Sequence, residues 1–101
     1  MAIKTKVQSD NGIVTEYHRV AMVKIDTNQQ NTILVLSYLN KDARQIEKDY
    51  ENGEYNGIEE TLHFPYTNYE YINTEYMPNM TVEAAYAYLK TLSKFKNAED
   101  V

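Results

Sequence analysis

The 101-residue sequence contains no cysteine and no tryptophan, and it has only three glycines and two prolines. The absence of cysteine excludes a disulfide scaffold, zinc fingers and thiol catalysis, and it is typical of a cytosolic or virion protein. No 18-residue apolar run is present and no apolar stretch follows the first lysines, so we expect neither a membrane span nor a secretory signal. Three scattered glycines cannot form a glycine-rich phosphate loop.

Length and charge restrict the class of protein further. The length corresponds to one domain, residues 1–101, with one modest core. The net charge of -5 argues against a general nucleic-acid binder or a binder of anionic membranes. The charge is uneven, because residues 42–83 carry ten acidic and two basic side chains while the rest carries five acidic and eight basic ones. Opposite signs on one small domain can steer a partner or a second copy into register.

The first part of the chain predicts a β-hairpin. Residues 3–7 alternate between apolar and polar side chains, as in a half-buried strand. Asn11-Gly12 follows, and this dipeptide between alternating runs is a strong turn signal because both residues tolerate positive φ. The return strand runs from about Ile13 to Asp26. Its alternation changes phase near His18-Arg19, which predicts a bulge or bend there.

A third strand is expected in the middle of the sheet. Residues 27–31 are polar and predict a turn, and residues 32–39 form the most apolar run of the chain. Residues 40–58 lose the apolar pattern. A helical turn capped by Asn40 or Asp42 could lie there, but two glycines favour a loop.

The second half predicts one more strand and one helix. Glu59 to Phe64 alternates and is ended by a proline, and residues 66–80 are expected to be a long connection. Thr81 is expected to cap a C-terminal helix, with Asn97 as its left-handed stop. The helix would bury residues spaced at i, i+3, i+4 and i+7, namely Val82, Ala85, Tyr86, Leu89, Leu92 and Phe95.

Together these elements predict an α+β fold. We expect a small, mostly antiparallel sheet of about four strands, with one C-terminal helix packed on one face. Arg19 is expected to pair across that sheet with an acid such as Glu60.

No group of residues predicts catalysis or metal binding. His18 and His63 lie in different predicted strands with no third ligand spaced near either, so we expect no metal site. The carboxylate pairs, Glu59-Glu60 and Asp49 with Glu51, lie in hydrophilic sequence, where nothing would raise the pKa of a catalytic acid. We therefore expect a protein that is not an enzyme and that uses no cofactor.

Tyrosine is the abundant aromatic residue, with ten tyrosines against two phenylalanines. Tyr17, Tyr38 and Tyr86 stand where strand or helix periodicity predicts burial, so we expect them to replace phenylalanine and tryptophan in the core. The other group lies in the acidic connections and is the candidate interaction surface: Tyr50, Tyr55, Tyr66, Tyr69, Tyr71 and Tyr76.

Tyrosine offers a large rigid ring and a hydroxyl group, which suits protein interfaces and stacking on sugar rings. The alternative is that several of these rings cover the core. An unpaired, tyrosine-rich edge strand could also mediate oligomerisation by strand addition.

The order of several segments resembles a known group of proteins. These segments are Gly12-Ile13-Val14-Thr15-Glu16-Tyr17-His18-Arg19-Val20, Ser37-Tyr38-Leu39, Lys41-Asp42-Ala43-Arg44, Leu62-His63-Phe64-Pro65-Tyr66 and Ala85-Tyr86-Ala87-Tyr88-Leu89-Lys90-Thr91-Leu92. The chain resembles, over nearly its whole length, small proteins encoded among the tail or baseplate genes of phages and prophages of Gram-positive bacteria. The resemblance implies a role in virion assembly or in the tail, and it supplies no active site.

The expected function is that of a non-enzymatic structural or assembly protein acting by protein–protein contacts. Its partners would be other phage structural proteins or further copies of itself, not nucleic acid or a membrane. It would act in the host bacterial cytoplasm during assembly, in the virion, or in both. Two alternatives stay open. One is an acidic nucleic-acid mimic that inhibits a host protein, and the other is a carbohydrate-binding module using the tyrosine-rich segment.

Overall fold

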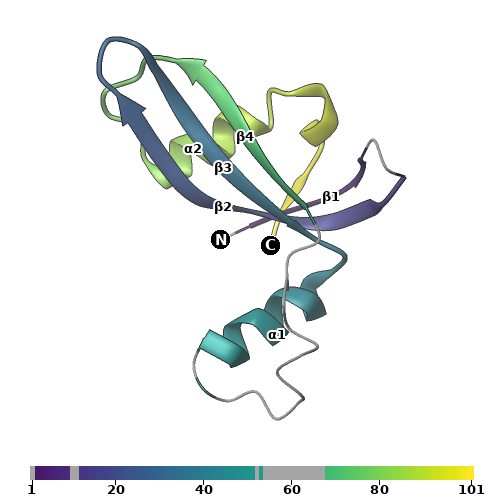
Figure 1. Ribbon diagram of the computed structural model, residues 1–101. Coiled ribbons are helices and arrows are strands. Elements are labelled where there is room, and N and C mark those ends of the chain that lie inside the picture. Colours follow the sequence, from purple (N-terminus) through teal and green to yellow (C-terminus); the bar gives the residue numbers. More distant parts are fainter. Residues whose placement is uncertain (1, 10–11, 52, 54–67) are drawn as a thin grey trace.

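The computed structural model describes residues 2–9, 12–51, 53 and 68–101 (Figure 1). Its elements in chain order are β1 (Ile3–Gln8), β2 (Val14–Asp26), β3 (Gln30–Tyr38), α1 (Lys41–Glu51), β4 (Asn68–Glu75), α2 (Val82–Leu89), the short 3₁₀ helix η2 (Ser93–Phe95) and β5 (Glu99–Asp100). The strands form one antiparallel sheet in the order β4-β3-β2-β1-β5. The predicted α+β class is confirmed, with one strand and one helix more than expected. Neither described α-helix is long and apolar enough to span a membrane.

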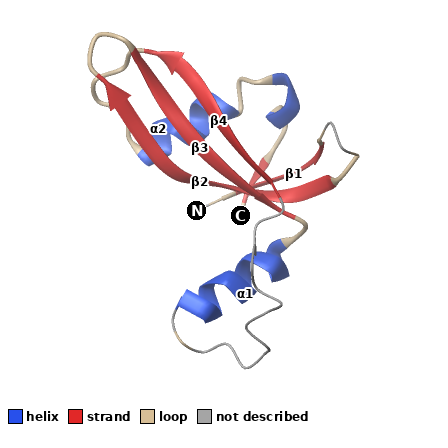
Figure 2. Cartoon of the chain, viewed as in Figure 1, coloured by secondary structure: helices blue, strands red, loops and turns tan. Residues whose placement is uncertain are grey.

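The long β2–β3 hairpin is the centre of the sheet (Figure 2). Its turn lies at the predicted polar segment, where Asn28 adopts a φ of 60°. The predicted change of phase in β2 is present but lies later, since the register shifts between Val20 and Met22. Because this bulge adds one residue, Val20 and Val23 both face the same core although they are three residues apart.

The β1–β2 hairpin also forms as predicted. Gly12 has a φ of +86°, a conformation that costs a residue with a Cβ and explains the glycine. Its amide donates to the Ser9 carbonyl at 2.9 Å, and the Ser9 amide donates to the Ile13 carbonyl at 2.9 Å.

The segment after β3 differs from the prediction, because it forms the helix α1 where a loop was favoured. The Asn40 side chain accepts a hydrogen bond from the Ala43 amide at 2.9 Å and so caps the helix, as one of the two expected caps. The sequence offers little sign of this helix, because it has no apolar stripe. Ile46 is 40% exposed, and the buried one among its described side chains is a carboxylate, Glu47.

Both outer strands of the sheet were missed. β4 occupies residues predicted as a connection, and the two-residue β5 pairs with β1. Strands at an edge are held by backbone hydrogen bonds to one neighbour and bury little apolar surface, so they leave a weak hydrophobic pattern. The strand predicted at residues 59–64 lies outside the described residues.

The C-terminal helix is shorter than predicted. Thr81 caps α2 through a 3.1 Å bond from the Ala84 amide to its side-chain oxygen, as expected. The helix ends at Leu89, and η2 then places Phe95 in the core. Val82, expected to be buried, is 52% exposed, whereas Asn97 has the predicted left-handed φ of 68°.

The sheet has two faces with different cover. The covered face packs against α2 and η2, and its buried residues are Ile3, Val20, Ile33, Val35, Met80, Ala85, Tyr86, Leu89 and Phe95. The open face lacks α2 and has a smaller buried cluster of Ala2, Tyr17, Leu36 and Tyr38. The predicted burial of Tyr17, Tyr38 and Tyr86 is therefore confirmed, with the first two on the open face.

Candidate functional site

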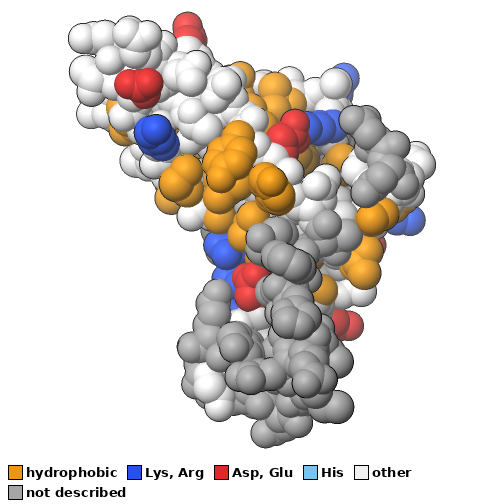
Figure 3. Space-filling model, in the orientation of Figure 1, with side chains coloured by type: hydrophobic (Ala, Val, Ile, Leu, Met, Phe, Trp, Pro, Cys, Tyr) orange, Lys and Arg blue, Asp and Glu red, His pale blue; other side chains and the backbone are white. Residues whose placement is uncertain are grey.

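The candidate site is an apolar patch on the open face, formed by Met22, Leu34, Leu36, Tyr69 and Tyr71. Strand register brings these residues together, because Met22 and Tyr71 both lie opposite Leu34 and Tyr69 lies opposite Leu36. Met22 is 40% exposed, and the two tyrosines are 57% and 58% exposed. Figure 3 shows this face with hydrophobic side chains gathered over its middle. We call these five residues the open-face patch.

Tyr69 and Tyr71 are the most prominent members of the open-face patch. They stand two residues apart on β4 and therefore point to the same side of the sheet. Their ring centroids are 6.0 Å apart and the ring planes meet at 81°, an edge-to-face arrangement. The two rings therefore lie in contact on the strand at the edge of the sheet.

A polar rim borders one end of the open-face patch. The rim consists of three residues paired across adjacent strands: Lys24 on β2, Thr32 on β3 and Asn73 on β4. Each lies two residues along its strand from a member of the open-face patch. The Thr32 hydroxyl donates to the Asn73 side-chain oxygen at 3.0 Å. An apolar centre with a polar rim is the usual layout of a protein interface.

The strand that carries the two tyrosines is held firmly from the covered face. Asn31, fully buried, donates from its side-chain amide to the Met77 carbonyl at 2.7 Å and accepts from the Met77 amide at 3.2 Å. Glu70 forms an ion pair with Lys94. Together with the backbone pairing to β3, these contacts fix the place of β4, which carries Tyr69 and Tyr71, and of the segment that follows it.

A buried polar network joins α1 to the end of the open face. Glu47 is 7% exposed and accepts a hydrogen bond from the Tyr38 hydroxyl at 2.7 Å. Arg19 donates to that hydroxyl at 2.9 Å and lies 3.5 Å from the Glu47 carboxylate, which also pairs with Arg44. One carboxylate therefore connects two strands to the helix.

Burial raises the pKa of Tyr38 to about 12; the hydrogen bond from Arg19 opposes this shift and the bond to Glu47 adds to it. The Tyr38 hydroxyl therefore stays protonated at neutral pH and serves as a donor to Glu47. The acid expected to pair with Arg19, Glu60, lies outside the described residues.

His18 is buried under the covered face, where it has a structural environment. Its Nε2 lies 2.8 Å from the Thr5 carbonyl oxygen, which can only accept, so this nitrogen carries the proton. Nδ1 then accepts from the Ser37 hydroxyl at 2.8 Å. Phe95 packs edge-on against the ring, with centroids 5.2 Å apart. Burial lowers the pKa of His18, and the bond to Thr5 opposes that shift.

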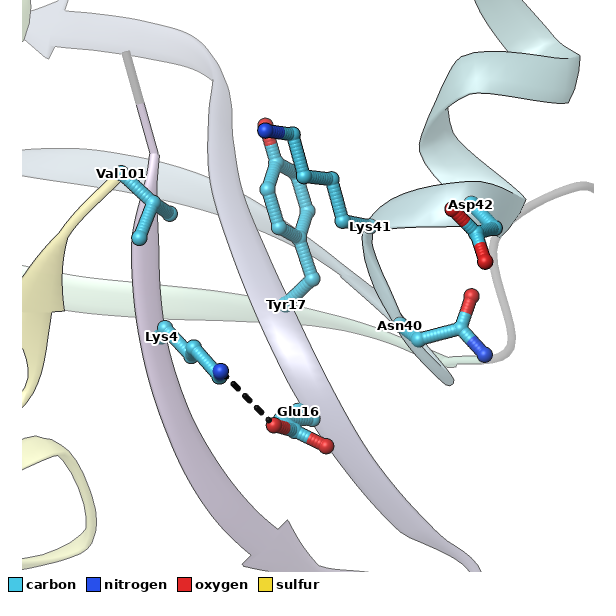
Figure 4. A pocket seen from close by; sticks show the side chains of 7 residues that line it. All are labelled: Lys4, Glu16, Tyr17, Asn40, Lys41, Asp42 and Val101. Carbon is cyan, nitrogen blue, oxygen red and sulfur yellow. Dashed lines mark ion pairs between the residues drawn. The ribbon is translucent and has the colours of Figure 1, made fainter.

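A surface cavity of about 380 Å³ lies beside the start of α1 (Figure 4). Lys4 and Glu16 form an ion pair across it at 3.4 Å. Two lysines and two acids share its wall, so it favours neither anions nor cations by charge. The residues that line it are Lys4, Glu16, Tyr17, Asn40, Lys41, Asp42 and Val101. Within the described ranges, no group of three or more histidine, cysteine, aspartate or glutamate side chains is arranged to hold a metal ion.

Of the six candidate tyrosines, the structure brings Tyr69 and Tyr71 together on the open face. Tyr76 is half-buried just after β4. Tyr50 lies in α1, but its side chain is outside the described part of the chain, as are Tyr55 and Tyr66.

The residues missed by the sequence prediction are the aliphatic members of the open-face patch. Alternation along residues 32–39 could have placed Leu34 and Leu36 on one side of β3. Met22 could not have been added to them, because the bulge before it decides its side. Comparison of the chain with family models, with curated proteins and with solved structures gave no match in any of the three.

Proposed function

We propose that this protein is a non-enzymatic phage or prophage protein that acts in tail or baseplate assembly through protein–protein contacts. The observation that carries the proposal is the open-face patch, an apolar surface on which Met22 and two tyrosines of one strand are exposed. Contiguous exposed apolar surfaces on small proteins mark interaction sites. The segment order described above adds the class of protein, and the protein would act in the host cytoplasm during assembly or within the virion.

The chemistry of the open-face patch favours a protein partner. None of its five residues is charged, and charged residues are depleted at the centres of protein interfaces while tyrosine and methionine are enriched. Tyrosine adds contact area at a low cost in side-chain entropy and is common among interface hot spots. Because β4 is paired with β3 along its length, little ordering of its backbone is needed on binding.

The distribution of acids does not favour the nucleic-acid mimic. Acidic residues of the segment 42–83 that are described stand on three elements: α1, β4 and α2. Glu47 is buried between two arginines, and Glu70 pairs with Lys94. A mimic needs its carboxylates free and on one surface to occupy a basic groove.

Carbohydrate binding is also less favoured by the geometry. Tyr69 and Tyr71 meet at 81°, so the two rings do not form one flat platform for a sugar.

A capture experiment tests the proposal. The purified chain is immobilised and exposed to tail and baseplate proteins expressed from the same genome. We expect Met22→Asp to reduce capture about tenfold or more, because a charge inside an apolar contact is left without a partner. Val82→Asp is the matched control, since Val82 is equally apolar, 52% exposed and lies on α2. Equal capture by both variants, together with absence of the chain from purified virions, would contradict the proposal.

A further inference from the structure

β4 lies at the edge of the sheet and is long enough to bind another strand. It has eight residues and pairs on one side with β3, and no described strand pairs with its other side. A strand at an edge presents a row of backbone N–H and C=O groups that a further strand can use. The opposite edge, β5, has only two residues and cannot serve equally well.

We infer that β4 binds β4 of a second copy of this chain, antiparallel, around a two-fold axis that passes through Ile72. The two sheets then join into one. The inference goes beyond the proposed function, because the surface it uses is the backbone edge of β4 and not the open-face patch. A two-fold contact of this kind needs one strand that complements itself. Wherever residue i of one copy meets residue j of the other, residue j of the first copy also meets residue i of the second.

Strand geometry leaves few registers that use most of β4, since only an axis through Tyr71 or Ile72 pairs seven of its eight residues with the second copy. Directly opposite residues of an antiparallel pair face the same side of the sheet, so the two-fold axis must pass through a residue and not between two. Centring the axis on Glu70 places that carboxylate against its own copy, which is repulsive. Centring it on Tyr71 places Glu70 against Ile72, a charge beside an apolar side chain.

The register centred on Ile72 avoids both conflicts. It sets Glu70 opposite Thr74, and it sets Tyr69 opposite Glu75, so each acid meets a neutral partner with a hydroxyl group. The two Ile72 side chains face each other beside the covered-face core, against which Ile72 packs. Glu70 already has Lys94 as a counter-charge, which limits repulsion between the two acidic strands.

This register also extends the open-face patch. Tyr71 lies opposite Asn73 of the second copy, and the two copies of Tyr71 become diagonal neighbours on the same face, within reach of each other. The patches of both copies, including Tyr69 and Tyr71 of each, thus become one surface across the axis. The dimer would present a doubled site to further partners.

Cysteine cross-linking tests the register, and the chain is suited to it because it has no cysteine. In the proposed dimer the Cα atoms of the two residues 72 are about 4.5–5.5 Å apart, within the range for a disulfide. We expect Ile72→Cys to give, on mild oxidation, a covalent dimer of twice the 11.8 kDa chain mass. Tyr71→Cys and Asn73→Cys are the controls. Their own copies are offset by two residues along the strands, about 7 Å, and so should cross-link far less.

A charge pair tests the same register in the reversible dimer. Tyr69→Glu and Tyr69→Lys both remove the ring, but only Tyr69→Glu places like charges against Glu75, twice in each dimer. By analytical ultracentrifugation we expect the dimer of Tyr69→Glu to have a dissociation constant about tenfold or more higher than that of Tyr69→Lys. Ala87→Glu and Ala87→Lys, at an exposed position of α2, control for the change in net charge and should not differ from each other.

The outcomes separate the two proposals. A wild-type chain that stays monomeric at high concentration, with no Ile72→Cys cross-link, overturns the dimer. If such a monomer still captures tail proteins through Met22, the proposed function stands without it. Stronger cross-linking at residue 71 or 73 than at 72 overturns the register. A dimer that cross-links at 72 but captures no tail protein supports the inference and contradicts the proposed function.

Discussion

The two faces of the same strands differ in how they are used. On β3, Ile33 points to the covered face and is fully buried, whereas Leu34 points to the open face and is only half-buried. The reason lies in the neighbours, because α2 and η2 cover one face and α1 contacts only the end of the other. The covered face holds the fold together, and the open face leaves apolar surface available for contacts.

Tyrosines show the same difference. Tyr86 is 4% exposed, and its hydroxyl accepts a 2.8 Å hydrogen bond from the Val20 amide. Burial raises the pKa of Tyr86, while the bond from Val20 opposes the shift. Tyr71, on the open face, is 58% exposed. The same residue type thus supports the core on one side and forms a contact surface on the other.

The largest expected effect comes from adjacent truncations on β3. Ile33→Ala should lower the free energy of unfolding by about 2–5 kcal/mol, because it leaves a cavity in the covered-face core. Leu34→Ala should cost less than half as much, since its side chain is already partly in solvent. Urea denaturation measures both losses of unfolding free energy, provided that the m-values of the two variants equal that of the wild type. Equal losses would show that the open face is as well packed as the covered one.

The next effect concerns the network that anchors α1 to the open face. Glu47→Gln should cost about 2 kcal/mol, because hydrogen bonds to a charged group are lost and two arginines lose their shared carboxylate. Asp49→Asn, which alters an exposed bond to Gln45 on the same helix, should change stability by less than about 0.5 kcal/mol. Thermal unfolding compares them, and a neutral Glu47→Gln would contradict an anchoring role.

A smaller effect separates the two kinds of tyrosine. Tyr86→Phe removes the acceptor for the buried Val20 amide and should cost about 1–3 kcal/mol. Tyr71→Phe should leave stability nearly unchanged. The comparison is matched, since each variant removes one hydroxyl group. If Tyr71→Phe proved as costly as Tyr86→Phe, the open face would be engaged in the fold itself.

The smallest effect is a pH dependence centred on the covered face. Burial lowers the pKa of His18 from its usual value of 6.5, so the unfolded chain takes up a proton at a higher pH than the folded one. The free energy of unfolding should therefore decrease as the pH falls below about 6.5, and level off once the folded imidazole is also protonated. Melting temperatures measured between about pH 7.5 and 5.5 should show this fall, and His18→Gln should flatten it. An unchanged slope in that variant would assign the dependence to other groups.

Much of the fold follows from local patterns in the sequence. The three N-terminal strands were predictable because each alternates or is continuously apolar, and their turns carry Asn28 or Gly12 at positive φ. Thr81 at the start of α2 was predictable because it satisfies an orphan amide of the first turn. α1, β4 and β5 were not, because a buried carboxylate and backbone pairing at the edges hold them without an apolar stripe.

The candidate site could be only half predicted. The abundance of tyrosine in an acidic segment pointed to Tyr69 and Tyr71, and the structure places both on the open face. The sequence could not show that Met22 and Leu34 lie beside them, because residues far apart in the chain become neighbours only through strand register.

The sequence by itself determined the scarcity of phenylalanine and the absence of cysteine and tryptophan, and with them the use of tyrosine both as core and as surface. It also determined the class of fold, since periodicity and turn chemistry act locally along the chain. The tertiary structure alone decided which face each tyrosine occupies and which strand lies at the edge. Those choices depend on one bulge in β2 and on which face α2 covers, and both arise from packing between distant segments.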